Sequence, residues 1–77
     1  MNKNKIERNA RKVWLLISRE NRQWNFAELQ QATGLSEKDL HFAIGWLAHD
    51  NKIQFGHRMN GSVDTEYYGL DINLYIG

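Results

Sequence analysis

The segment 34–53 (GLSEKDLHFAIGWLAHDNKI) carries the clearest local signals in the chain. Gly34 can end a preceding helix in the left-handed conformation, and Ser36 is a favourable N-cap for the next helix. Between them, Leu35 can fill the inner side of the turn. Beyond this cap, apolar residues recur at i, i+3, i+4 and i+7, which predicts a helix with one buried face. These residues are Leu40, Ala43, Ile44 and Leu47. With Ile53 beginning a strand, the segment is typical of the second half of a helix-turn-helix.

Residues 4–20 are predicted to form the first helix, because apolar side chains recur there at helical spacing without glycine or proline. Lys3 and Lys5 lie at its start, where the helix dipole favours anions. Two interpretations of this start remain open: a frayed, solvated end, or a basic arm that contacts a polyanion. A break at 21–25 follows the helix.

The break leads into a short second helix. Trp24 is predicted as a short strand or an extended residue that closes the sheet, and Asn25 as a helix cap with Glu28 in the reciprocal capping-box position. Ser36 and Asp39 repeat this capping pattern for the third helix. The residues of the second helix that we expect to face inward are Phe26, Leu29 and Ala32.

From residue 52 the hydrophobic period changes to that of a strand. Asn60 and Gly61 are a strong hairpin signal, since both residue types tolerate positive φ. Folding back at this turn would bring 62–70 beside 52–59. The residues expected on the buried face are Ile53, Phe55, Tyr68 and Leu70. The order of elements predicts an α+β fold, a winged helix-turn-helix with three helices and a small antiparallel sheet whose hairpin is the wing.

The last residues alternate apolar and polar side chains, a strand pattern that runs past any partner the hairpin supplies. The tail either packs across its own domain or pairs as an edge with a second chain. The second interpretation makes Ile72, Leu74 and Ile76 candidates for a dimer interface.

Length and composition limit the alternatives. Seventy-seven residues predict a single domain over 1–77, with a flexible start at 1–3 and an extended tail at 71–77. A core of this size leaves only about 3–5 kcal/mol of stability, so self-association is an expected supplement. The chain has no cysteine, no hydrophobic signal segment and no run long enough to span a bilayer. We therefore expect a cytoplasmic protein without disulfides and without a membrane partner.

The segment 45–55 (GWLAHDNKIQF), preceded by GLSEKDLHFAI and by VWLLI in the first helix, resembles a family of small bacterial winged helix-turn-helix domains of unknown function. The most specific part is GWLA at 45–48 leading to NKI at 51–53. His49 stands where the family pattern leads us to expect a basic residue, and the tail has no counterpart in that pattern. The resemblance covers the first two-thirds of the chain. It implies a winged helix and a homodimer, and DNA binding by analogy with the wider superfamily.

Charge is divided unevenly, although the net charge is only +1. Residues 1–22 hold seven cations against two carboxylates, for a net charge of +5, and the remainder holds three cations against seven carboxylates, for −4. The hairpin cations face Asp64 and Glu66, so few phosphates could be neutralised there and the first helix is the more basic surface. The candidate contacts for nucleic acid, with double-stranded DNA as the partner, are Lys5, Arg8, Arg11, Lys12, Arg19, Lys38 and Arg58.

The third helix carries a second stripe on the side away from its buried face. Its members, again at i, i+3, i+4 and i+7, are Phe42, Gly45, Trp46 and His49. A glycine inside a helix costs ~1 kcal/mol relative to alanine, so Gly45 indicates the close approach of another backbone or ring. Exposed aromatic patches mark protein interfaces, which makes these four residues the candidate dimer interface. The alternative is that Trp46 folds beneath the first helix or the wing and belongs to the core.

The chain carries no motif for catalysis. His41 and His49 are too far apart on one helix for an i, i+4 metal pair, and no glycine-rich phosphate loop, nucleophile elbow or paired-carboxylate motif is present. We therefore expect no enzyme activity, no cofactor and no metal. Two functions remain open: a homodimeric regulator-type domain that binds nucleic acid, and a protein-interaction module that keeps the fold without binding DNA through its third helix.

Overall fold

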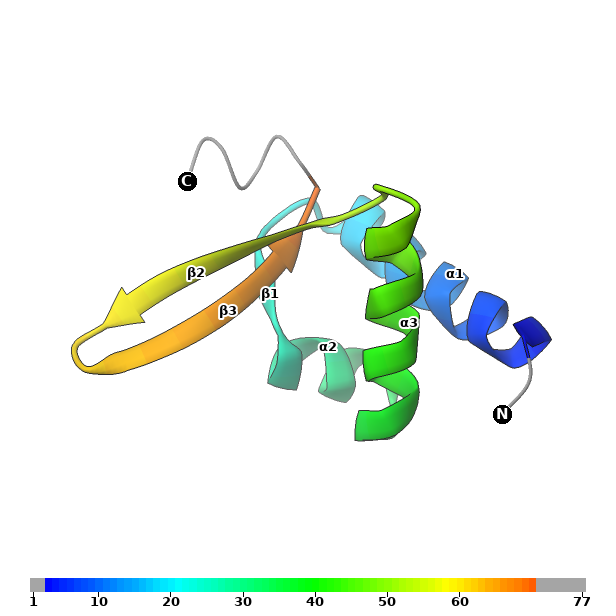
Figure 1. Cartoon of the computed structure of the whole chain (residues 1–77), viewed down its shortest axis with the longest axis horizontal. Helices are drawn as coiled ribbons and strands as arrows, with labels where there is room; N and C mark the ends of the chain where they lie inside the picture. Colours follow the sequence, from blue (N-terminus) through cyan, green and yellow to red (C-terminus); the bar gives the residue numbers. More distant parts are fainter. Residues whose placement is uncertain (1–2, 71–77) are drawn as a thin grey trace.

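The computed structural model describes residues 3–70, which form three helices and one antiparallel sheet. In chain order the elements are α1 (Lys3–Arg19), β1 (Trp24–Asn25), α2 (Phe26–Thr33), α3 (Glu37–His49), β2 (Gln54–Asn60) and β3 (Val63–Gly69). The helices form one part of the molecule, and the β2–β3 hairpin projects from it as the wing (Figure 1). The predicted fold, a winged helix-turn-helix, is confirmed.

α1 begins and ends one residue before the predicted range. Its buried residues, Ala10, Val13 and Ile17, are three and four residues apart, so they form one face that packs into the same core as the buried face of α3. Burying each of the larger aliphatic side chains contributes about 1.5–3 kcal/mol. α1 therefore turns its other side, with most of its charge, to solvent.

Capping residues set both ends of α2 and the start of α3. The Glu28 backbone N–H donates to Asn25 Oδ1 at 2.8 Å and the Asn25 N–H donates to Glu28 Oε1 at 2.9 Å, which completes the predicted capping box. α2 ends at Gly34, whose φ of 73° lies in the left-handed region that glycine adopts without strain. The Asp39 N–H donates to Ser36 Oγ at 3.1 Å. These hydrogen bonds confirm the predicted caps and fix the turn between the two helices.

α2 buries Thr33 rather than Ala32. The predicted inward position of Ala32 is wrong, because this residue is exposed, whereas Leu29 is buried as predicted. The Thr33 hydroxyl donates to the Leu29 carbonyl at 2.7 Å and accepts from the Leu35 N–H at 3.3 Å. Because both hydrogen bonds satisfy the Thr33 hydroxyl, burying it costs little free energy, and α2 can turn this polar residue rather than Ala32 toward the core.

The sheet has the strand order β1-β3-β2, so β3 is its central strand. Trp24 on β1 pairs with Tyr68, which confirms the short strand predicted there. The hairpin turn lies one residue later than predicted: β2 runs to Asn60, which pairs with Val63, and the φ of Gly61 is 68°. The wing is therefore a tight hairpin that continues the short sheet outward.

Phe55 is not part of the core, contrary to the prediction. It lies opposite Tyr68 on the same face of the sheet, and the two rings meet edge to face with 5.5 Å between centroids. Tyr68 pairs with Trp24 on one side and Phe55 on the other and is buried, whereas Phe55 lies on the edge strand farther from β1 and is 48% exposed. Ile53, just before β2, is buried as predicted, and Leu70 packs against the core.

Neither α1 nor the other helices within residues 3–70 combine the length and the apolar character that crossing a membrane requires. The predicted tail at 71–77, with Ile72, Leu74 and Ile76, lies outside the described residues.

Candidate nucleic-acid interface

The side of α1 opposite its buried face carries a line of cations. Arg8, Lys12, Leu15 and Arg19 follow one another at spacings of four, three and four residues, so they lie along one side of the helix. Arg11 lies beside this line, and all of these side chains are exposed. We call the four cations among these residues, Arg8, Arg11, Lys12 and Arg19, the α1 outer face. Because an α-helix rises about 1.5 Å per residue, Arg8 and Arg19 are about 16 Å apart along its axis.

The cations of the α1 outer face are not neutralised within the described protein. None of the ion pairs between residues 3 and 70 involves Arg8, Arg11, Lys12 or Arg19. No carboxylate in the described part of the chain therefore pairs with these cations, and the helix presents a positive surface to an external polyanion.

Lys5 differs from these cations because it has an internal partner. Its Nζ lies 3.8 Å from Asp39 Oδ2, which links the start of α1 to the first turn of α3. An ion pair this exposed contributes less than about 1 kcal/mol, so it orients the side chain more than it stabilises the fold. The chain is helical from Lys3 onward.

A groove of about 220 Å³ lies between α1 and the end of α2. It is lined by Lys12, Leu15, Leu16, Arg19, Ala32 and Thr33. We did not predict this groove, because the spacing along one helix does not reveal how a second helix packs beside it. The available signal was Leu15, an apolar residue on the polar side of α1.

The outward side of α3 carries Lys38, Phe42, Gly45 and His49, all exposed and at spacings of four, three and four residues. Phe42 is 46% exposed. A Cβ built on Gly45 would have no heavy atom from another described element within 4 Å. The close neighbour expected for this glycine is therefore not supplied by residues 3–70.

Trp46 lies beside the exposed residues of this stripe and is less exposed than they are. It is half-buried, packs against the core, and lines a cleft of about 210 Å³ between α1 and α3 together with Trp14. Lys52 Nζ lies 5.6 Å from the centroid of the Trp14 ring, within the range of a cation–π contact. Trp46 is thus neither fully buried nor as exposed as Phe42.

The first turn of α3 is the part that approaches base edges in a groove-reading helix-turn-helix. Here it carries Glu37 and Asp39. Among the residues of α3, Lys38 is the single lysine or arginine. His41 Nε2 lies 3.9 Å from Glu37 Oε1, and the His41 ring stacks on the ring of Phe26 with 4.5 Å between ring centroids. Asp39 is paired with Lys5, whereas Glu37 is exposed, and a carboxylate at this position repels phosphates. The chemistry of α3 is therefore poorly suited to entering a DNA groove.

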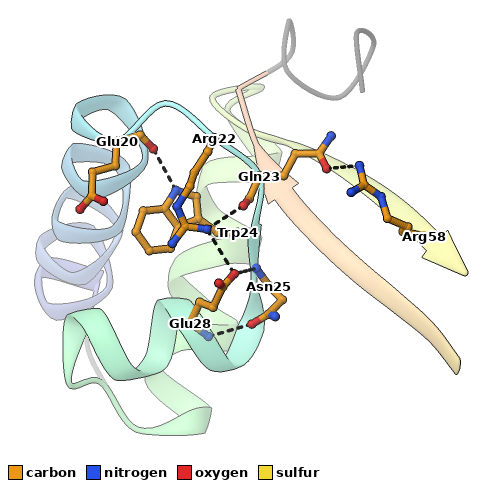
Figure 2. A network of polar contacts seen from close by, with 7 residues as sticks. All are labelled: Glu20, Arg22, Gln23, Trp24, Asn25, Glu28 and Arg58. Atoms are coloured by element: carbon orange, nitrogen blue, oxygen red, sulfur yellow. Dashed lines mark hydrogen bonds and ion pairs between the residues drawn. The ribbon is translucent and has the colours of Figure 1, made fainter. Parts of the chain in front are cut away.

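The wing places its cations against internal partners. Arg58 Nη2 donates to Gln23 Oε1 at 2.6 Å (Figure 2). His57 lies between two carboxylates: its Nδ1 is 3.4 Å from Asp64 Oδ2 and its Nε2 is 3.5 Å from Glu66 Oε2. The structure therefore does not bring Arg58 together with the α1 outer face, and the wing offers no concentrated positive charge.

Figure 2 shows the polar network that fixes the segment between α1 and α2. The Arg22 guanidinium lies 3.6 Å from the centroid of the Trp24 ring, and its Nη1 donates to the Gln23 carbonyl at 3.0 Å and to Glu28 Oε1 at 3.4 Å. Trp24 Nε1 donates to the Glu20 carbonyl at 3.0 Å. We did not predict this role for Arg22, because its partners are set by how β1 and α2 fold around it.

The histidine, carboxylate and phenol side chains of the described residues bear on whether the domain could hold a metal ion or move a proton. No group of three or more histidine, aspartate or glutamate side chains in residues 3–70 is placed to hold a metal ion. Burial raises the pKa of Tyr68, and a hydrogen bond from its hydroxyl to Glu66 Oε1 at 2.5 Å acts in the same direction. This phenol therefore stays protonated and serves the fold.

Comparison with known proteins agrees with this geometry. The family model described as winged helix-turn-helix domain (DUF2582) matches residues 1–63. No curated protein and no solved structure matches the chain. The match covers all three helices, β1, β2 and the hairpin turn. The chain therefore belongs to this winged helix-turn-helix family, whose function is unknown.

Proposed function

We propose that this domain binds the phosphate backbone of double-stranded DNA through the α1 outer face. The observation that carries the proposal is a set of four exposed cations that have no ion-pair partner among residues 3–70: Arg8, Arg11, Lys12 and Arg19. Membership of a winged helix-turn-helix family supports a regulator-type role in nucleic-acid binding.

The size of the α1 outer face indicates how the affinity should behave. Duplex DNA carries one negative charge per about 1.7 Å of its axis, so a helix face about 16 Å long meets several phosphates. If four cations each neutralise one phosphate, the logarithm of the affinity should fall with the logarithm of salt concentration with a slope of about −3.6. Binding of this kind is strong in low salt and weak in high salt.

The same chemistry predicts little sequence preference. Phosphate contacts fix the position of a protein on DNA, whereas hydrogen bonds to base edges specify the sequence. The exposed residues of α3 are Glu37, Lys38, His41, Phe42, Gly45 and His49, and among them Lys38 alone is of a type that makes bidentate contacts to a base edge. Bidentate readout of guanine requires arginine or lysine, and readout of adenine requires asparagine or glutamine. α3 therefore contributes little to specificity in this proposal.

A titration of labelled mixed-sequence duplex at several salt concentrations tests the proposal. Arg8→Gln and Arg19→Gln should each weaken binding to every sequence alike and reduce the salt slope by about 1. Lys38→Gln is the matched control, because it removes the same charge from an exposed position on α3. A larger loss for Lys38→Gln than for Arg8→Gln would contradict a contact through α1.

A second candidate function is self-association through α3. It is favoured by the exposure of Phe42 and by the open space around Gly45, which would admit a helix from a second copy. In this proposal Phe42, Gly45, Trp46 and His49 contact the partner copy, and the tail residues Ile72, Leu74 and Ile76 extend the contact. Light scattering should then give a mass near twice 9.1 kDa. A clean monomer at high micromolar concentration would contradict it.

The two candidates are compatible. A dimer formed through the exposed side of α3 would not use Arg8, Lys12 or Arg19, so it would offer two sets of these cations to one DNA molecule. Arg11 differs from them because it lines the same cleft as Trp46. Avidity from two α1 faces can exceed the affinity of either face alone, provided that both reach the same duplex.

A further inference from the structure

The groove between α1 and α2 combines two features that phosphate binding alone does not require. Its floor is apolar: Leu15 is 44% exposed, Ala32 is exposed, and Leu16 packs against the core beside them. Its rim carries Lys12 and Arg19. We call this surface the α1–α2 groove. Single exposed apolar residues are ordinary, but here two of them from different helices line one hollow.

The two charged side chains that line the α1–α2 groove, Lys12 and Arg19, are both cations. No carboxylate is among its lining residues, and the Thr33 hydroxyl is already occupied by hydrogen bonds with Leu29 and Leu35. Lys12 and Arg19 lie on either side of Leu15, three and four residues away along α1. An occupant must therefore supply negative charge at two places and an apolar group between them.

We propose that the α1–α2 groove docks an acidic peptide segment of a partner protein. Lys12 and Arg19 are seven residues apart on a helix, which is about 10 Å. An extended peptide advances about 3.3 Å per residue and points every second side chain to the same face. Two carboxylates four positions apart, about 13 Å, therefore face the groove together with the side chain midway between them, and the long Lys12 and Arg19 side chains can cover the difference in distance. An apolar side chain between the carboxylates then rests on Leu15 and Ala32. The charge-assisted hydrogen bonds give orientation, and the buried apolar side chain gives selectivity over polyanions that lack one.

The location of the groove links this partner to the proposed function. Lys12 and Arg19 belong both to the α1–α2 groove and to the α1 outer face, so an acidic peptide and DNA cannot engage them at the same time. This competition rests on the proposed function, whereas docking of the peptide does not. An acidic partner segment would thereby displace the domain from DNA.

The test uses the full chain and two labelled synthetic peptides in low salt. One peptide has two aspartates four positions apart with a leucine midway between them, and the other has serine in place of the leucine. Fluorescence anisotropy should show at least about fivefold weaker binding for the serine peptide, because burial of a leucine side chain is lost. Equal binding of the two peptides, or no binding of either, would overturn the proposal.

Two protein variants complete the test. Leu15→Ser should weaken binding of the leucine peptide by at least about fivefold and leave the affinity for duplex DNA within about twofold. Met59→Ser is the matched control, since Met59 is an apolar residue on the wing and is 64% exposed. If Leu15→Ser and Met59→Ser change peptide binding equally, the groove is not the site. Peptide binding that meets these expectations with no DNA binding would overturn the proposed function and leave the groove proposal standing.

Discussion

Arg58 on the wing and Gln23 before β1 are joined by a hydrogen bond of 2.6 Å, although they are 35 positions apart in sequence. The Arg58 guanidinium also lies 5.2 Å from the centroid of the Tyr67 ring on β3. One side chain thus ties the hairpin to the segment that connects α1 to the sheet. Because this contact already engages the Arg58 guanidinium, we do not count Arg58 among the cations that bind DNA.

Arg58→Ala should therefore loosen the wing with little effect on DNA binding. Amide hydrogen exchange in β2 and β3 should accelerate, because the hydrogen bond and the ring contact are both lost. The affinity for duplex DNA should change far less than for Arg8→Gln. Arg58→Lys serves as the control, since it keeps the charge but not the planar donor geometry. A DNA-binding loss in Arg58→Ala that Arg58→Lys restores would show that the wing contacts phosphates directly.

Asn25→Ala should lower the free energy of unfolding by about 1 kcal/mol, because it removes the side-chain acceptor for the Glu28 N–H at the start of α2. Urea denaturation followed by circular dichroism measures the change. Gln31→Ala, at an exposed position of the same helix, should leave stability within about 0.5 kcal/mol. Equal losses in the two variants would mean that the capping box contributes nothing measurable.

Gly45→Ala and Gly34→Ala should have opposite effects. Gly45 lies within α3 at a backbone conformation that any residue adopts, and a Cβ there meets no other described element, so alanine should raise the stability of the monomer by about 0.5–1 kcal/mol. Gly34 has a φ of 73°, so alanine there should lower the stability of the monomer by about 1 kcal/mol or more.

Self-association gives Gly45→Ala a second readout. If a second copy packs closely on Gly45, the added methyl group should weaken the dimer in sedimentation or light scattering while the monomer becomes more stable. A dimer that is unaffected by the substitution would remove Gly45 from the interface.

Tyr68 should make the fold sensitive to alkaline pH. Burial, reinforced by the hydrogen bond to Glu66, raises the pKa of Tyr68 above its ordinary value of 10.0. Above that pH the unfolded chain releases the phenolic proton while the folded chain retains it, so the folded state binds more protons and the free energy of unfolding falls as pH rises. Urea denaturation at pH 9 and pH 11 should show a smaller decline for Tyr68→Phe than for the unchanged protein. Equal declines would contradict the assignment.

Structural features that depend on residues close together in the sequence could be predicted from the sequence. The caps at Asn25 and Ser36, the turn at Gly34 and the buried face of α3 each follow from side chains within a few positions of one another, so local chemistry decides them. The cationic side of α1 could be predicted for the same reason, since one helix carries all of it.

The errors and omissions depend on how elements pack. Phe55 has the alternation of a buried strand residue, but its strand lies at the edge of the sheet, beyond the cover that buries Tyr68. Thr33 is buried because two backbone groups satisfy its hydroxyl, which composition does not reveal. The α1–α2 groove, likewise, exists only because Leu15 and Ala32 come together from two helices.

The most direct test of the central claim, that α1 rather than α3 meets DNA, is to map amide chemical shifts while mixed-sequence duplex DNA is added in low salt. We expect the shifts to concentrate in residues 5–19 and to disappear as salt is raised, because the contact is made by the cations of the α1 outer face. Shifts that concentrate in 37–49 with little change in 5–19 would contradict the account and would identify α3 as the DNA-contacting helix.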